Sequence, residues 1–127
     1  MIKKITLIVF FTISILVADE KLGIYAGDNN EYYLGCLNCS KDAKDSIFNT
    51  DGEYGNSNSY NSMFNQYGKF GGAYKHFSPC NKYSKTPPKI LDSDKNFYGY
   101  FTINTNKNKL DKDTNKWMKN ELCKDSM

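Results

Sequence analysis

The sequence contains no arginine and, after residue 18, no valine. Arginine supplies the planar, bidentate fork that recognition of phosphates and bases favours, so its absence argues against nucleic acid as a partner. After residue 18 the chain has only six leucines and four isoleucines, against ten tyrosines, six phenylalanines and one tryptophan. We therefore expect a core built largely from aromatic rings, in a small domain that needs extra covalent constraint.

Residues 1–18 have the composition of a secretory signal peptide. Lys3 and Lys4 precede an uncharged apolar run, and Ala18 provides a small residue at the cleavage point. The run covers thirteen residues, residues 5–17, which is shorter than the ~20 that a membrane-spanning helix needs. We expect a secreted or periplasmic protein with one domain over residues 19–127, which meets a membrane only through the signal before cleavage.

Four cysteines lie in the exported part of the chain, where disulfides form and persist. They are Cys36, Cys39, Cys80 and Cys123. Four cysteines allow three pairings, and sequence alone does not choose between them. We favour Cys36 with Cys39 and Cys80 with Cys123. A redox role is disfavoured, because a redox C-x-x-C pair normally begins a helix, whereas Cys36 follows an aromatic stretch. A zinc site that includes His76 is disfavoured by the irregular spacing of its ligands.

A sixteen-residue repeat occupies the middle of the chain. Its copies begin at Ser46 and Ser62, and a third, shortened copy follows. The two full copies share Ser, two apolar residues, Asn and a later Gly-x-aromatic-Gly, and the third has Cys80 where the others have Phe. The density of Gly and Asn predicts turns. We expect Phe48 and Phe64 at equivalent inward positions, and Cys80 buried and bridged.

Strand-like segments flank the repeat on both sides. Residues 22–26 and 32–37 enclose one polar turn, and residues 89–91 and 97–101 enclose another. Short apolar or aromatic stretches on either side of an Asp/Asn turn are typical of β-hairpins. The sequence therefore predicts two hairpins.

The C-terminal residues 111–124 are predicted to form a helix. Asp111, Asp113 or Thr114 can cap its start. The residues that fall on one face at helical spacing are Leu110, Thr114, Trp117, Met118 and Leu122. The predicted fold is a small β-rich (α+β) domain. Two hairpins flank turn-dense 16-residue repeats, a C-terminal helix follows, and disulfides stabilise the domain.

Two short acidic patterns resemble the first half of a calcium loop. The first consists of Asp92, Asp94 and Asn96, and the second of Asp111, Asp113 and Asn115. Both lack the required glycine, and the second lacks the acidic twelfth ligand, so turn formation and helix capping explain them equally. His76, the only histidine, has no partner that would complete a catalytic group. The sequence therefore favours a non-enzymatic protein without a cofactor.

Five tyrosines are interleaved with Asn, Ser and Gly, a mixture that binding surfaces use. They are Tyr54, Tyr60, Tyr67, Tyr74 and Tyr83. Two interpretations remain open: the rings form a face for a protein or glycan partner, or they form the core of a valine-free domain.

The sequence resembles a group of small exported bacterial proteins with tandem N-x-Y-G-x-Y-G repeats between two short β segments. The resemblance rests on residues 33–37, on the two Ser-x-x-Asn-x-x-Gly-x-aromatic-Gly copies, and on residues 87–90 and 96–101; it covers roughly residues 24–104. The chain departs from the pattern at Asp51, at Cys80 and in its cysteine-bearing helix. The resemblance implies little about activity.

We therefore expect a non-catalytic binding or structural module. The alternatives are a small secreted effector, such as a toxin or an enzyme inhibitor, and a thiol-redox or metal-binding protein that acts through Cys36 and Cys39.

Overall fold

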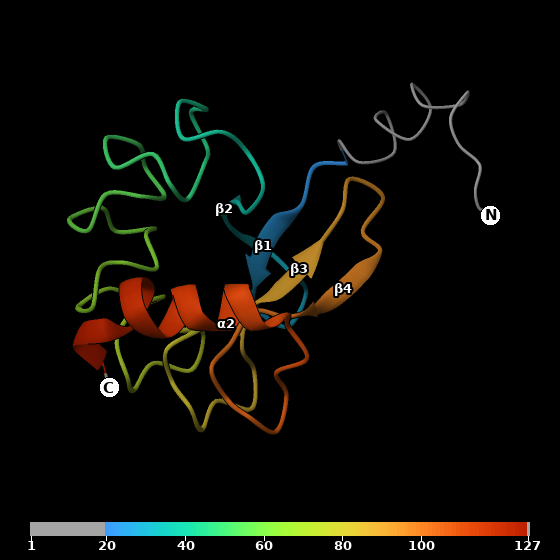
Figure 1. Ribbon diagram of the computed structural model, residues 1–127, viewed down its shortest axis with the longest axis vertical. Helices are drawn as coiled ribbons and strands as arrows, with labels where there is room; N and C mark the ends of the chain where they lie inside the picture. Colours follow the sequence, from blue (N-terminus) through green and yellow to red (C-terminus); the bar gives the residue numbers. More distant parts are fainter. Residues whose placement is uncertain (1–19, 127) are drawn as a thin grey trace.

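The computed structural model describes residues 20–126, so the predicted signal peptide lies outside the described residues. Four short strands and one helix form the regular structure (Figure 1). They are β1 (Gly23–Ala26), β2 (Tyr32–Cys36), β3 (Lys89–Leu91), β4 (Phe97–Tyr100) and α2 (Lys112–Trp117). The helix continues as a wider π turn over Met118–Leu122 and ends in a 3-10 turn over Lys124–Ser126.

The strands form one antiparallel sheet in the order β2-β1-β3-β4. Each predicted hairpin is present, since β1 pairs with β2 and β3 pairs with β4. The two hairpins join through β1 and β3, where Ile24 lies opposite Ile90. Asn30 and Lys95 adopt left-handed backbone conformations, with φ of 57° and 68°, in the two hairpin turns. The sheet thereby brings together chain segments 64 to 68 residues apart.

Residues 37–88 contain neither helix nor strand apart from a bridge between Cys36 and Ser46. Their turns are held by side chains, and the same hydrogen bonds recur every sixteen residues. A buried serine Oγ accepts from the backbone N–H two residues later, at 3.0–3.1 Å. The serines are Ser46, Ser62 and Ser78. An asparagine three positions after each serine donates its amide to a carbonyl six residues earlier, at 3.0 Å.

The core contains few aromatic rings. The expectation of a core built largely from aromatic rings is therefore wrong. Phe70 and Phe101 are the only buried aromatic side chains among the described residues, whereas all four isoleucines after residue 18 are buried. They are Ile24, Ile47, Ile90 and Ile103. The scarce aliphatic residues concentrate in the core, because burial of a compact aliphatic side chain needs no partner for a hydroxyl.

The expected inward position of Phe48 is also wrong. Its ring is 38% exposed, and the side chain before it, Ile47, fills the core instead. Sixteen residues later, Met63 is buried and Phe64 is only half-buried. Both rings contact Trp117 of α2 edge-to-face, at centroid distances of 5.2 and 6.1 Å. These phenylalanines therefore attach the helix to the loops.

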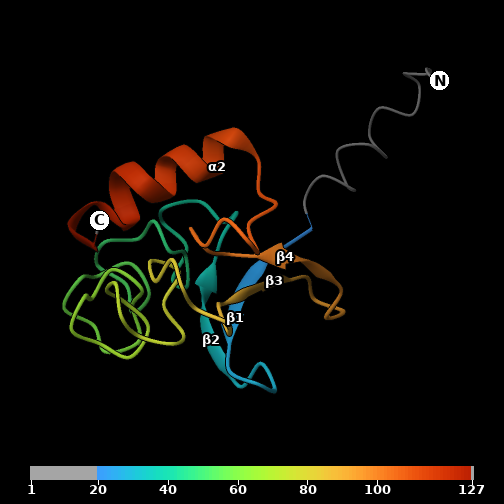
Figure 2. The same cartoon turned by 90° about the horizontal axis from the view of Figure 1, so that it is seen from below.

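Of the three predicted cap candidates, Asp111 caps α2, because its carboxylate accepts hydrogen bonds from the backbone N–H and the hydroxyl of Thr114, at 3.0 and 2.6 Å. Met118 and Leu122 are buried in the core. In Figure 2 the helix lies on one side of the loops, with the sheet beside them. The Cys80–Cys123 disulfide joins the end of the helix to the loop that begins at Ser78.

Candidate functional site

Four of the five candidate tyrosines lie on the surface. Tyr60, Tyr67, Tyr74 and Tyr83 are 68%, 85%, 91% and 77% exposed, respectively. Their loops are nevertheless fixed by the serine and asparagine hydrogen bonds. Of the two interpretations, surface or core, these four rings therefore take the surface position.

Tyr67 and Tyr83 are presented by the same turn, sixteen residues apart. The backbone N–H of Tyr67 donates to Asn65 Oδ1 at 3.1 Å, and that of Tyr83 donates to Asn81 Oδ1 at 3.0 Å. An asparagine that bonds the backbone two residues later forms an Asx turn, which restrains the local chain. The two rings therefore project from fixed backbone positions.

Tyr54 differs from the other four tyrosines. It is half-buried, and its ring packs against Tyr33 with the centroids 5.3 Å apart. Burial, followed by the nearby Glu53 carboxylate, raises the pKa of Tyr54. This ring is part of the packing beside the sheet and does not belong to the exposed set.

A hollow of about 440 Å³ separates Tyr74 from Tyr83. Ala73, Cys80 and Ile103 form its apolar walls, and Lys82 and Ser126 also line it. The Lys82 ammonium lies 5.5 Å from the centroid of the Tyr83 ring. The hollow thus combines two exposed rings, an apolar floor and one cation.

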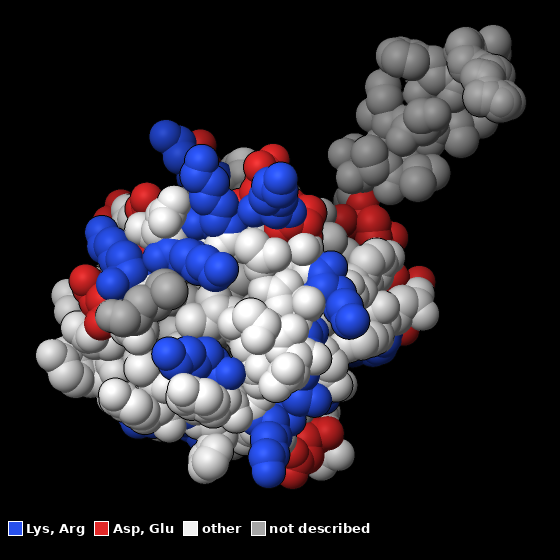
Figure 3. All heavy atoms as spheres, turned by 60° about the horizontal axis from the view of Figure 1, so that its bottom comes forward, with Lys and Arg blue, Asp and Glu red and all other residues white. Residues whose placement is uncertain are grey.

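The central segment that supplies most of this lining carries charge of only one sign. Residues 54–91 contain five lysines and no Asp or Glu. Figure 3 shows lysine side chains spaced over a largely uncharged face, with acidic groups mainly toward its edge. After residue 18 the chain has 15 lysines against 14 acidic residues, so its small net charge conceals a basic central segment.

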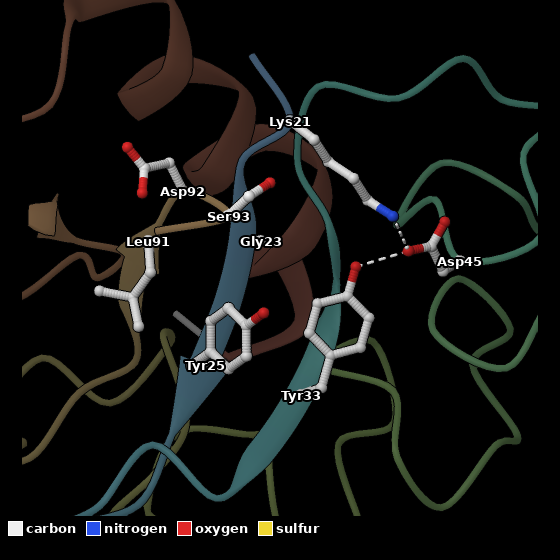
Figure 4. A pocket seen from close by; sticks show the side chains of 8 residues that line it. All are labelled: Lys21, Gly23, Tyr25, Tyr33, Asp45, Leu91, Asp92 and Ser93. Atoms are coloured by element: carbon white, nitrogen blue, oxygen red, sulfur yellow. Dashed lines mark hydrogen bonds and ion pairs between the residues drawn. The ribbon is translucent and has the colours of Figure 1, made fainter. Parts of the chain in front are cut away.

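A second hollow, of about 270 Å³, lies on the sheet side and contains an ion pair (Figure 4). Asp45 Oδ2 accepts a hydrogen bond from the Tyr33 hydroxyl at 2.5 Å and lies 2.9 Å from Lys21 Nζ. The Tyr33 hydroxyl, and then Lys21, hold the pKa of Asp45 below its ordinary value of 3.8. Burial, and then the bond to Asp45, raises the pKa of Tyr33.

This ion-paired group is suited to holding structure rather than to proton transfer. A carboxylate with a lowered pKa is a weak base at neutral pH, and a tyrosine with a raised pKa is a weak acid. Sequence reasoning missed these three side chains because they come from β2, from the loop after it and from the segment just before β1. Only the strand pairing and the Cys36–Ser46 bridge bring them together.

The calcium candidates serve as turn and cap residues. Asp92 accepts hydrogen bonds from the N–H groups of Asp94 and Asn96, from the Asn96 amide and from the Tyr98 hydroxyl, at 2.9–3.0 Å. Asp111 caps α2. Within residues 20–126, no group of three or more His, Cys, Asp or Glu side chains is arranged to hold a metal ion.

Both favoured disulfides are present, Cys36–Cys39 and Cys80–Cys123. Cys36 is buried at the end of β2 and does not begin a helix, unlike the first cysteine of a redox pair. His76 is exposed on its loop. Two disulfides fit an oxidising environment. None of the described helices has the length and apolar character needed to cross a membrane.

Comparison with known proteins used family models, curated proteins and solved structures, and no match to this chain was found in any of the three.

Proposed function

We propose that this protein is an exported, non-catalytic module that binds carbohydrate through its exposed tyrosines. The observation that carries this proposal is the exposure of Tyr67 and Tyr83, at 85% and 77%, on loops whose backbone is fixed. Exposing a large ring gains nothing for folding, because the apolar face stays in water. A rigid aromatic face offers a sugar ring a large contact area at low entropy cost.

The recurring hydrogen bonds support an interpretation of the central segment as tandem copies of one unit. Each unit presents the residue that follows its Asx turn: Asp51 in the first, Tyr67 in the second and Tyr83 in the third. A row of equivalent positions suits a ligand that is itself a repeating chain. On this proposal the protein belongs with the exported repeat proteins that its sequence resembles.

A glycan fits this surface better than a protein partner does. Stable protein interfaces bury roughly 800 Å² on each side around a continuous apolar core. Among the aromatic contacts of the described residues, none joins two of the four exposed tyrosines. The rings are separate and surrounded by Asn, Ser and Lys. A toxin or enzyme inhibitor would instead form a stoichiometric protein complex.

A glycan array probed with the oxidised protein tests the proposal. The Tyr67→Ala and Tyr83→Ala variants should each weaken binding about threefold to tenfold, the range expected from one aromatic contact. Tyr98→Ala is the matched control, since Tyr98 is exposed but lies on β4. Absence of binding to every glycan, or equal losses in all three variants, would contradict the proposal. A stoichiometric complex with a protein partner would also contradict it, if that complex still forms with the Tyr67→Ala and Tyr83→Ala variants.

A further inference from the structure

We infer that the hollow between Tyr74 and Tyr83 is a subsite for an anionic sugar residue. The sugar ring packs on the two tyrosines, and its carboxylate or sulfate group pairs with Lys82. This inference rests on the proposed carbohydrate binding and names the chemical class of the ligand.

The dimensions and walls of the hollow suit one ring of a glycan chain. Its volume of about 440 Å³ falls in the lower part of the ~300–1000 Å³ range of small-molecule sites. The buried side chains of Cys80 and Ile103 provide an apolar floor between two rings that stand in solvent. The Cys80–Cys123 disulfide fixes that floor to the C-terminal helix. The subsite is therefore preformed, which lowers the entropy cost of binding.

The charge of Lys82 is available to a ligand. The only ion pair formed within residues 20–126 joins Lys21 to Asp45, on the sheet side of the molecule. Among residues 20–126, the side chains that line the hollow include no Asp or Glu. The adjacent hollow that contains Asp125 shares only Ser126 with it. Within the described part of the chain, Lys82 is therefore the one charged side chain of the lining.

The hollow beside Trp117 provides an internal contrast. It is also aromatic, with Phe48 and Phe64 in its lining, but Glu121 and Asp125 line it together with Lys124. Two carboxylates against one ammonium disfavour an anion there. The two hollows therefore share aromatic walls but differ in charge, and this difference assigns the anionic ligand to the Tyr74–Tyr83 hollow.

The experiment compares glycans that differ only in charge. The oxidised protein is titrated with oligogalacturonate and its methyl ester, and with heparin-derived tetrasaccharides before and after desulfation. We expect the charged member of at least one pair to bind more tightly. Lys82→Gln should lower that affinity about threefold to fivefold, as expected for one exposed ion pair, and leave the neutral ligand unchanged. Raising the salt concentration should reduce the same difference.

Lys124→Gln is the matched control, because Lys124 lines the other hollow. Equal binding of charged and neutral glycans, with both weakened by Tyr74→Ala, overturns the anionic subsite and keeps the carbohydrate-binding proposal. A charge preference that survives Lys82→Gln also overturns the subsite. Failure of every oligosaccharide, charged or neutral, to bind here and on the array overturns both proposals.

Discussion

The ring of Phe48 lies against Trp117 with the centroids 5.2 Å apart and the planes at 63°. Phe64, sixteen residues later, contacts the same indole at 6.1 Å. After another sixteen residues, Cys80 is bonded to Cys123. Equivalent positions of three successive segments thus all attach the C-terminal helix, two by ring contacts and one by a covalent bond.

Trp117→Ala should lower the free energy of unfolding by about 2 kcal/mol, because it removes a half-buried ring from two edge-to-face contacts. Chemical denaturation of the oxidised protein measures this loss. A double-mutant cycle with Phe48→Ala should give a coupling energy of about 1 kcal/mol. Strict additivity of the two substitutions would show that the contact contributes nothing to stability.

The two disulfides should differ in their effect on stability. Replacing Cys80 and Cys123 together by alanine opens a loop that spans 43 residues, against 3 for Cys36 and Cys39. The entropy of loop closure predicts losses of about 4 and about 2 kcal/mol, respectively. Thermal unfolding of the two double variants compares them directly. A larger loss on removing Cys36 and Cys39 would contradict this order.

Gly71→Ala should destabilise the loops by about 2–3 kcal/mol, because an added Cβ would lie 2.1 Å from the backbone carbonyl oxygen of Asn65. Gly68→Ala is the matched control in the same loop, where the nearest atoms are 3.3 Å away. That substitution should cost less than about 1 kcal/mol. Denaturant midpoints separate the two variants, and equal midpoints would refute the predicted close packing.

Asp45 should make stability depend on acidic pH. Its pKa is lower in the folded protein than its ordinary value of 3.8, so its contribution is complete above that value. The contribution is lost as the pH falls through the folded pKa. Asp45→Asn should therefore destabilise the protein at neutral pH and flatten the stability profile below about pH 4. Urea midpoints between pH 2.5 and 6 (a range set about the ordinary carboxyl pKa) measure this, with the exposed Asp42→Asn as control.

Asp51→Tyr should add a third ring at the exposed Asx-turn positions, which already hold Tyr67 and Tyr83. The Asp51 N–H donates to Asn49 Oδ1 at 3.1 Å, in the same way as the N–H groups of Tyr67 and Tyr83. Asp51 is exposed, so stability should change by less than about 0.5 kcal/mol. Affinity for long oligosaccharides should rise about threefold to tenfold, while short ones bind unchanged. Equal gains for both lengths would contradict a repeating ligand.

Local signals were sufficient for the hairpins and for the start of the helix. They did not choose the cysteine pairs, because Cys80 and Cys123 are 43 residues apart. Turn residues between strands and the cap at Asp111 act within a few residues, so their patterns are visible in the sequence. The sequence did not show which of Ile47 and Phe48 is buried, because both are apolar. The choice depends on Trp117, which contacts Phe48 only after the helix has packed. The group of Lys21, Tyr33 and Asp45 depends wholly on tertiary pairing. Tyrosine spacing was equally compatible with a core or a surface.

The buried serines and the asparagines that follow them have one role in each loop, and the exposed side chains have another. The serines and asparagines supply the hydrogen bonds that hold the turns, so the outward positions carry no structural obligation. Substitutions at residues 51, 67 and 83 can therefore alter what the surface contacts without disturbing the fold. Such an arrangement allows a few exposed side chains to be replaced while the inner residues, and the backbone that they hold, stay the same.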